Sequence, residues 1–577
     1  MTRAAAVWER PAHQLAIAEA LEALDIRRLV LTIHDASFPA GAEDIGRGTP
    51  YSESGRAFFG FVRALGFTGV QLGPQGLTSR DNPSPYDAML FSREPLSIAV
   101  APLVGRDLWR AAVGDVPWTT ARHADHRRAW DRQAAALSAL WQTRGAAWAA
   151  DVHAFAAANA GWIDRDAAVD AMAPEHYRFV QWLAHRQHEE LRVALSRLGL
   201  KLYGDLQIGV SHRDRRTLAP LFLDGYAMGA PPSRTNPAGQ PWGYPVLDPA
   251  QYDGAVGTLV AARLDKMLAD YDGLRVDHPH GLVDPWIYRA DAADLLAAVR
   301  AGARLFSSPD LPDHPRLAHF AIARAEQLDR GEVRWADGWV RTLDAAQVDR
   351  YAALFAKMVE RVRAHGHRVD DLLCEVLSTW PHPLRCVMER EGLGRLCVTQ
   401  KANLDDGRDV YRSENARGCD WIMVGNHDTP PLWQLTDRWH QTPTAQRRAA
   451  HLAERLEPDA AARPAFAAWL QASAGRVATA MFADLFASPA KNVSIFFADL
   501  FGYRESYNQP GTVSDENWRL RVAPDYAAEY ARDLANADDP RALNLPRALA
   551  LALRADPARR RTHASLLLRL DALADEH

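Results

Sequence analysis

The chain has 577 residues, of which 48% are apolar and 24% charged, so it can hold several domains or one large barrel with insertions. Its net charge of −5 argues against a nucleic-acid-binding protein, which usually carries a surplus of basic residues. The four cysteines form no Cys-x-x-Cys pair, which argues against a zinc ribbon or a thioredoxin motif and fits a reducing compartment.

The N-terminus lacks an apolar stretch of signal-peptide length, because charged residues such as Glu9, Arg10 and Glu19 recur in it. No apolar run approaches the roughly 20 residues of a membrane span. We therefore expect a cytoplasmic protein with no membrane or nucleic-acid partner, present as a monomer or a simple homo-oligomer.

The first part of the chain alternates between helical and strand patterns. A helical lead-in is predicted over residues 1–27, because leucines recur at helical spacing from 12 to 25. Strand runs follow at 28–34 and 69–73, separated by a helical stretch. This alternation is the opening of a βα barrel or of a doubly wound sheet.

Two stretches read as insertions. Residues 93–195 are rich in Ala and predict a helical insertion, and residues 290–370 predict a further one that is mostly helical and polar. The pair His123 and His126 could suggest a metal cluster, but it lies at a polar, Arg-rich helix start without a third ligand nearby. We therefore expect a solvated face there and no metal site.

The remaining chain, 28–92 and 196–577, is predicted to form the catalytic barrel. Strand runs lie near residues 29, 69, 202, 273, 372, 396, 421 and 493, which is the strand number of a closed barrel. The predicted fold class is therefore α/β, a (β/α)8 TIM barrel with mostly helical insertions. The Pro/Gly-rich stretch 229–248 predicts a long loop, and loops of that length inside a compact fold are usually functional.

The stretch 271–286 carries the most informative residues. Arg275 and Asp277 are two apart in a short strand run, so they share one face, and an Arg beside an Asp keeps that carboxylate ionised. A structural ion pair at a strand end is the alternative interpretation. Two apolar runs follow later in the chain. Residues 371–378 carry Glu375, and residues 421–428 end on His427-Asp428. Three strand runs that each present a carboxylate near the carboxyl end predict an active site at that face of the barrel.

The order Arg-x-Asp-His, then a buried Glu, then His-Asp resembles the alpha-amylase clan of retaining glycosidases and transglycosylases. Within the clan the chain resembles the amylomaltase family, the 4-alpha-glucanotransferases or disproportionating enzymes of glycoside hydrolase family 77. The similarity spans roughly residues 28–525. Further matching segments are Leu72-Gly-Pro74, Ser84-Pro-Tyr86, Tyr507-Asn-Gln-Pro-Gly511 and Asn517-Trp-Arg519. In Trp242-Gly-Tyr-Pro245 the Trp matches, and Tyr244 departs from the Asn of the family.

The resemblance implies roles for individual residues. Asp277 matches the nucleophile, Glu375 the general acid/base and Asp428 a third carboxylate that holds the sugar. The substrate-binding residues that it implies are Tyr86, Asp205, Trp242, Arg275, His278 and His427. Packing on the barrel rim is the alternative role for Tyr86, and loop packing is the alternative for Trp242. The resemblance implies neither a cofactor nor a metal.

Several departures from the family pattern make this a divergent member. Pro279-His-Gly281 stands where the family has Phe-Arg-Gly, and Thr429-Pro-Pro431 stands where it has Asn-Asp-Thr. We expect a 4-alpha-glucanotransferase acting on maltooligosaccharides through a covalent glycosyl-Asp intermediate. The alternatives are an alpha-glucan hydrolase or transglycosylase with altered donor or acceptor, and a catalytically lapsed glucan-binding barrel. A dehydrogenase or kinase is not supported, because the chain has neither Gly-x-Gly-x-x-Gly nor a P-loop.

Overall fold

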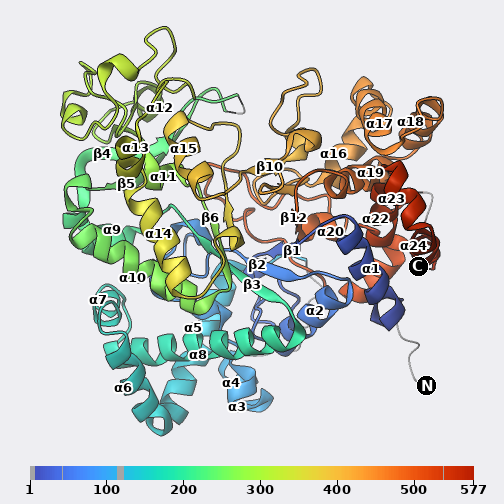
Figure 1. Cartoon of the computed structure of the whole chain (residues 1–577). Helices are drawn as coiled ribbons and strands as arrows, with labels where there is room; N and C mark the ends of the chain where they lie inside the picture. The colour runs from blue at the N-terminus through green and yellow to red at the C-terminus, as the bar shows by residue number, and fades with distance from the viewer. Residues whose placement is uncertain (1–6, 42, 114–121, 235, 537–538, 577) are drawn as a thin grey trace.

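Eight parallel strands form the centre of the computed structural model, which describes residues 7–41, 43–113, 122–234, 236–536 and 539–576 (Figure 1). They are β1 (Arg28–Ile33), β2 (Gly69–Leu72), β3 (Lys201–Leu206), β6 (Gly273–Val276), β9 (Leu372–Cys374), β10 (Leu396–Val398), β11 (Trp421–Met423) and β12 (Asn492–Phe496). Their order in the sheet is β10-β11-β12-β1-β2-β3-β6-β9. A hydrogen bond from Leu396 N to Val376 O, 3.2 Å long, joins the two ends. The predicted (β/α)8 barrel and all eight predicted strand runs are confirmed.

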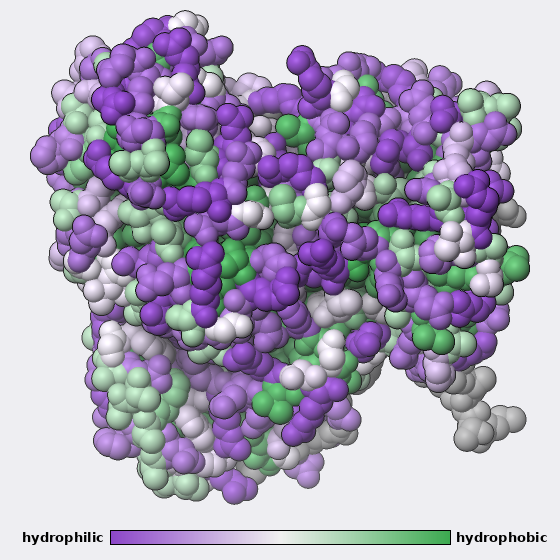
Figure 2. Space-filling model, in the orientation of Figure 1, coloured by the Kyte–Doolittle hydropathy of each residue, from purple (hydrophilic) through white to green (hydrophobic). Residues whose placement is uncertain are grey.

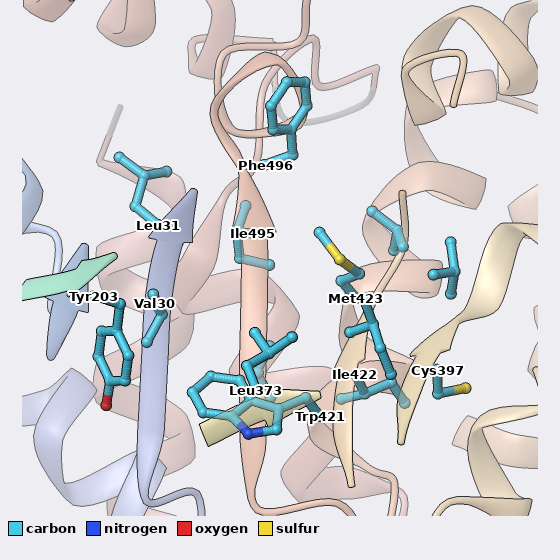
Figure 3. Packing of buried hydrophobic residues seen from close by; sticks show 14 of the residues in the cluster. Val30, Leu31, Tyr203, Leu373, Cys397, Trp421, Ile422, Met423, Ile495 and Phe496 are labelled. Atoms are coloured by element: carbon cyan, nitrogen blue, oxygen red, sulfur yellow. The ribbon is translucent and has the colours of Figure 1, made fainter. Parts of the chain in front are cut away.

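The strands read as apolar runs because helices or loops cover both of their faces. Every residue of β1 and of β12 is buried. Figure 3 shows Val30 and Leu31 of β1 beside Ile495 and Phe496 of β12 in this core. The main helices around the strands are α2 (Glu53–Ala64), α8 (Pro174–Leu198), α10 (Ala255–Asp270), α14 (Ala353–Ala364), α15 (His382–Arg390) and α19 (Ala474–Phe486).

A buried polar cluster ties the strands together at their amino ends. The carboxylate of Asp371, which is 2% exposed, accepts hydrogen bonds from Arg28 Nε at 2.7 Å, Lys201 Nζ at 2.7 Å and Tyr203 Oη at 2.8 Å. Arg28 Nη1 also donates to Asn492 Oδ1 at 2.9 Å. In TIM barrels this end of the strands serves stability and the opposite end serves function.

Replacing Asp371 with Ala is expected to lower the free energy of unfolding by about 3–5 kcal/mol, because Arg28 would stay buried without its one buried carboxylate partner. Urea denaturation or the thermal midpoint measures the loss. The neighbouring Asp370 is the control, since it also contacts Arg28, at 3.0 Å, but its side chain is 37% exposed. Asp370→Ala is expected to lose about 1 kcal/mol or less. Equal losses in the two variants would contradict the role of the buried cluster.

A second sheet stands on the rim of the barrel. Its order is β5-β4-β7-β8, built from β4 (Phe222–Ala230), β5 (Gln240–Leu247), β7 (Trp286–Arg289) and β8 (Ala303–Arg304), all antiparallel. The prediction of a continuous loop over 229–248 is therefore wrong, because β4 and β5 form a hairpin there. Pro241 and Pro245 are tolerated because β5 is an edge strand, whose outer face needs no backbone donor.

Residues 93–195 contain the helices α3 (Ala101–Val104), α4 (Arg106–Val113), α5 (His126–Arg144), α6 (Ala149–Ala158), α7 (Ile163–Ala167) and α8, which lie below the barrel in Figure 1. Residues 114–121 of this stretch and 1–6 of the lead-in lie outside the described residues. His123 contacts Glu505 at 2.7 Å, and His126 contacts the backbone oxygen of Ser79 at 2.8 Å, so the two imidazoles have separate partners. The division into a separate insertion stays a prediction.

Residues 290–370 are helical only in part, so the expectation of a mostly helical stretch is wrong. α12 (Leu295–Arg300) lies near its start, and α13 (Ala345–Tyr351) and α14 near its end. Between them the chain forms the short strand β8 and 3-10 turns at Pro315–His319 and Ala325–Gln327. Pro309, Pro312 and Pro315 each remove a backbone donor, which explains the irregular path. Whether this stretch is an insertion stays a prediction.

The first α-helix and the last helices of the chain lie together beside the barrel (Figure 1). α1 (Pro11–Ala23) packs against α22 (Leu545–Arg554) and α24 (Ala564–Asp575). α16 (Leu432–Trp439), α17 (Pro443–Leu456) and α18 (Arg463–Gln471) lie between β11 and β12 in the sequence, and all three pack against α19. Among the described residues, no helix has both the length and the apolar character needed to cross a membrane. Hydrophilic residues predominate on the face drawn in Figure 2, with hydrophobic ones in small groups among them.

Candidate active site

β6 delivers Asp277 and His278 to the carboxyl end of the barrel. Asp277 N donates to Leu206 O at 3.1 Å, and its Oδ2 accepts from Ile208 N at 3.1 Å, so both contacts come from the neighbouring β3 segment. His278 has a φ of 41°, in the left-handed region that residues other than Gly rarely adopt. Backbone strain of this kind persists where the surrounding structure holds it, and it clusters at functional sites.

Arg275 joins three carboxylates at the centre of the site. Its Nη1 donates to both oxygens of Asp205 at 2.8 and 2.9 Å. Its Nη2 lies 3.2 Å from Asp277 Oδ1 and 2.6 Å from Glu375 Oε2. All four side chains are buried, and a buried carboxylate is tolerated only when it is paired. The ion pair expected between Arg275 and Asp277 is thus one contact in a network that spans β3, β6 and β9.

The network fixes the charge of Asp277 and His278. Burial alone would raise the pKa of Asp277, but Arg275 and a hydrogen bond from His278 outweigh it, and the pKa lies well below its usual range. Burial would lower the pKa of His278, but Asp277 and Glu375 outweigh it and raise that pKa. His278 Nδ1 lies 3.4 Å from Asp277 Oδ1 and 3.3 Å from Glu375 Oε2. Asp277 is therefore an ionised, positioned carboxylate.

Asp277 and Glu375 face one another from adjacent strands. Glu375 follows β9 directly, and its backbone N donates to Val276 O at 3.0 Å, which locks it beside β6. A carboxylate oxygen from each residue and a ring nitrogen of His278 all lie within 4.8 Å of one another. Retaining glycosidases hold two carboxyl groups about 5–5.5 Å apart, so this spacing suits attack by one group and proton transfer by the other.

The same three side chains have the residue types and the spacing of a metal site. Arg275, however, already supplies a buried positive charge at 3.2 Å from Asp277 and 2.6 Å from Glu375. A divalent cation between these carboxylates would face that guanidinium at close range, which is electrostatically unfavourable. The arrangement therefore favours an arginine-paired carboxylate cluster.

Asp428 follows β11 and opens toward solvent, with its side chain 34% exposed. His427 Nε2 lies 3.5 Å from Asp428 Oδ2, and Asn508 Nδ2 donates to Asp428 Oδ1 at 2.6 Å. Sequence reasoning gave no role to Asn508, although the segment 507–511 that contains it was singled out. The contact with Asp428 depends on a pairing of distant loops, which the sequence pattern does not reveal.

Aromatic rings close one side of the site. Tyr86 Oη donates to Asp205 Oδ2 at 2.9 Å, and its ring stacks on His427 with centroids 5.1 Å apart and planes at 21°. His34 and Trp518 pack against the same imidazole at 5.2 and 5.8 Å. Sequence reasoning assigned neither of these two residues to the site. They come from opposite ends of the chain and meet because β1 and the segment around 518 lie on the same side of the barrel mouth.

Trp242 lies in β5, in the hairpin that β4 and β5 form on the rim of the barrel. The centroids of its ring and of the His278 ring are 4.8 Å apart, and the two ring planes make an angle of 72°. Its Nε1 donates to Gln240 Oε1 at 3.1 Å, which fixes the indole. Trp242, His278, Glu375 and Asp428 all line one cavity of about 700 Å³. A cavity of this size is within the range of small-molecule sites. The structure therefore brings the predicted site residues into this cavity or into the carboxylate network beneath it, except His427, which joins them through Tyr86 and Asp428.

The departures from the family pattern have structural roles beside the cavity. His280 Nε2 lies 3.1 Å from the backbone oxygen of Thr379. Thr429 Oγ1 accepts from Asn426 N at 2.9 Å, and Pro430 O accepts from Gln400 Nε2 at 3.0 Å. The contacts of Thr429 and Pro430 hold the loop that carries Asp428, whereas His280 contacts the segment after Glu375.

Comparison with known proteins identifies the family of the chain. The profile of glycoside hydrolase family 77, described as 4-alpha-glucanotransferase, matches residues 169–526, which is more than half of the chain. The 4-alpha-glucanotransferase of Haemophilus influenzae is 32% identical over 124 residues, 19% of this chain and 17% of that protein. The rice chloroplastic/amyloplastic enzyme DPE1 is 28% identical over 133 residues, 22% of each chain. The chain thus aligns with only about a fifth of the length of these curated relatives.

Solved structures support the fold. The amylomaltase of Streptococcus agalactiae, solved in complex with acarbose, superposes with a TM-score of 0.64 at 17% identity and covers 88% of this chain and 97% of its own. The amylomaltase of Corynebacterium glutamicum gives 0.63 at 17% identity, covering 97% and 77%. With the family profile matching more than half of its length, the chain belongs to the 4-alpha-glucanotransferase family, glycoside hydrolase family 77.

Proposed function

We propose that the protein transfers alpha-1,4-glucan segments between maltooligosaccharides with retention at the anomeric carbon. The observation that carries this proposal is the pair Asp277 and Glu375, with carboxylate oxygens within 4.8 Å and Arg275 in contact with both. Membership of the family supports the substrate class, as do the names of the curated relatives. The structure of the Streptococcus agalactiae amylomaltase, which was solved in complex with acarbose, also supports a carbohydrate ligand for this protein.

In the first step Asp277 acts as the nucleophile. One of its oxygens attacks the anomeric carbon of the donor while Glu375 gives a proton to the glycosidic oxygen, and the bond between these two donor atoms breaks. Glu375 Oε2 faces Arg275 and His278, which leaves Oε1, 3.5 Å from Asn426 Nδ2, for the proton. The shortened glucan leaves, and the other part stays as an ester on Asp277.

In the second step an acceptor sugar replaces the departed glucan. Glu375, now a carboxylate, takes the proton of the acceptor 4-hydroxyl as its oxygen attacks the anomeric carbon. The bond to Asp277 breaks and the carboxylate is restored next to Arg275. Asp428 and His427 are proposed to hold hydroxyls of the donor sugar, with Tyr86 at its side and Trp242 toward the acceptor.

Incubation of the purified protein with maltotriose tests the function. We expect a ladder of shorter and longer glucans with an unchanged total of reducing ends, because each bond broken is remade. Rising reducing ends would identify an alpha-glucan hydrolase instead, in which water reaches the ester first. Bound maltotriose without turnover, with affinity unchanged by Glu375→Gln, would identify a lapsed glucan-binding barrel.

Asn508→Ala is expected to lower kcat/KM for maltotriose about tenfold, because hydrogen bonds to charged groups contribute about 1.5–3 kcal/mol. The loss should appear mainly in kcat if Asn508 orients Asp428 toward the transition state. Asn508→Asp should lose more, since two carboxylates would stand where an amide now donates to Asp428 at 2.6 Å. Gln509 is the control, because it is exposed and its recorded hydrogen bonds use only backbone atoms. An equal loss in Gln509→Ala would show that the loop as a whole, rather than Asn508, matters.

A further inference from the structure

Lys401 stands at the mouth of the barrel between the two carboxylates of the cavity. It follows β10 directly, and β10 is flanked in the barrel by β9, which precedes Glu375, and by β11, which precedes Asp428. The side chain is half-buried and lines the same cavity of about 700 Å³. Burial lowers the pKa of its ammonium, which Glu375 and Asp428 oppose at longer range. No hydrogen bond or ion pair joins its Nζ to the part of the chain that the structure describes.

A second cation lines the same cavity. Arg304, in β8, is 3% exposed, and its Nη2 donates to the backbone oxygen of Trp335 at 3.2 Å. Its Nε is buried and has no hydrogen-bond partner among the described residues. His280, also in the cavity wall, is different: burial lowers its pKa to about 3, its Nε2 donates to Thr379 O, and its buried Nδ1 is therefore an acceptor. Lys401 and Arg304 therefore bring cationic donors without described partners to this cavity.

The acidic groups of the cavity do not balance these donors. Among the described residues that line it, the carboxylates are Glu375 and Asp428, and both are committed to the proposed reaction. A buried cation without a partner is unfavourable, whereas the same cation forms strong charge-assisted hydrogen bonds with a phosphate group. Arg28 and Arg275 differ from Arg304, because each forms close ion pairs with carboxylates of the protein. Asp284 and Asp337 act on Arg304 only at longer range.

We propose that the acceptor in this cavity is a sugar that carries a phosphate group, and that Lys401 is the residue that selects it. The inference rests on the proposed transfer function and names its acceptor. In glucose 6-phosphate, C6 is attached to the carbon next to the one that bears the 4-hydroxyl. The hydroxyl can therefore meet Glu375 while the phosphate meets Lys401, whose strand is next to that of Glu375.

The same bonds form and break with this acceptor as with an acceptor sugar that carries no phosphate group. The acceptor 4-hydroxyl oxygen forms the bond to the anomeric carbon, the bond from that carbon to Asp277 breaks, and the proton goes to Glu375. The phosphate takes no part in bond making and stays on the product. Its role is to hold the acceptor through Lys401, with Arg304 as a further positive charge in the wall.

Binding tests the inference without any turnover. Calorimetry on the wild-type chain should find glucose 6-phosphate bound about tenfold or more tightly than glucose, as expected for a charge-assisted contact. Lys401→Met should remove this difference. Lys357→Met is the matched control, because Lys357 is a half-buried lysine on the outer helix α14, and it should keep the difference. Equal binding of the two sugars, or an unchanged preference in Lys401→Met, would overturn the proposal.

Turnover tests the same preference with maltotriose as donor. Products identified by mass should include maltooligosaccharides that carry one phosphate, and glucose 6-phosphate should be favoured over glucose as acceptor. Inorganic phosphate is the third arm: if it accepts the glucosyl group and binds as tightly, the site takes free phosphate and the assignment to a phosphorylated sugar is wrong. If maltotriose is not turned over with any acceptor, the proposed function fails. The calorimetric preference would still decide whether the anion site exists.

Discussion

Replacing Asp277 with Asn is expected to lower kcat/KM for maltotriose by about 10⁴-fold or more, the scale found when a covalent nucleophile is removed. An amide cannot form the glycosyl ester, and it also leaves Arg275 without one of its carboxylate partners. The fold should persist, because Asp205 and Glu375 still pair with Arg275. Reducing-end and product-length assays measure the rate, and maltotriose binding to the variant verifies that the site is still formed.

Asp272 provides the control for that variant, because it lies at the amino end of the same strand. Its Oδ2 accepts from Leu202 N at 2.9 Å, far from the carboxyl end where Asp277 lies. Asp272→Asn should keep a rate close to that of the wild type. Full activity in the Asp277→Asn variant would exclude the glycosyl-Asp mechanism.

Glu375→Gln is expected to lower the rate with maltotriose about 10²–10⁴-fold, the usual contribution of general acid–base catalysis. The effect should depend on the leaving group. Alpha-maltosyl fluoride releases fluoride without protonation, so the ester on Asp277 should still form and then accumulate. Mass spectrometry of the trapped protein should find the glycosyl group on the peptide that contains Asp277.

Azide distinguishes the proposed roles of Glu375 and Asp277. It attacks the ester without needing a base, so it should restore turnover of the fluoride by Glu375→Gln and give the alpha-glycosyl azide. Asp277→Asn should not respond in this way, because it forms no ester. If maltosyl fluoride and maltotriose lost activity equally in Glu375→Gln, Glu375 would not be the acid that protonates the leaving group.

The barrel could be predicted from the sequence because its strands are buried on both faces. Runs such as 28–34 and 492–496 are mostly apolar, and the strands that they form are buried along their whole length, which distinguishes them from the amphipathic helices around them. The rim sheet could not be predicted in the same way. Pro241 and Pro245 are signals of a loop, and only the position of β5 at a sheet edge makes them compatible with a strand.

The site was predictable where its residues are close in sequence. Arg275, Asp277 and His278 lie in one short run, so their shared position at a strand end follows from the pattern. The contacts of Arg275 with Asp205 and Glu375 depend on β3, β6 and β9 being neighbours in the barrel, which no local pattern encodes. Their roles came from the resemblance to a family, and they remain proposals.

The placement of β1 between β2 and β12 has a consequence for synthesis on the ribosome. β1 can pair with β2 early, but its other neighbour, β12, is made some 460 residues later. At a synthesis rate of about 5–20 residues per second, β1 stays without its β12 partner for roughly half a minute to a minute and a half. During that time an apolar strand edge is open to other chains. Nascent chains of this protein are therefore expected to need a chaperone until β12 has emerged.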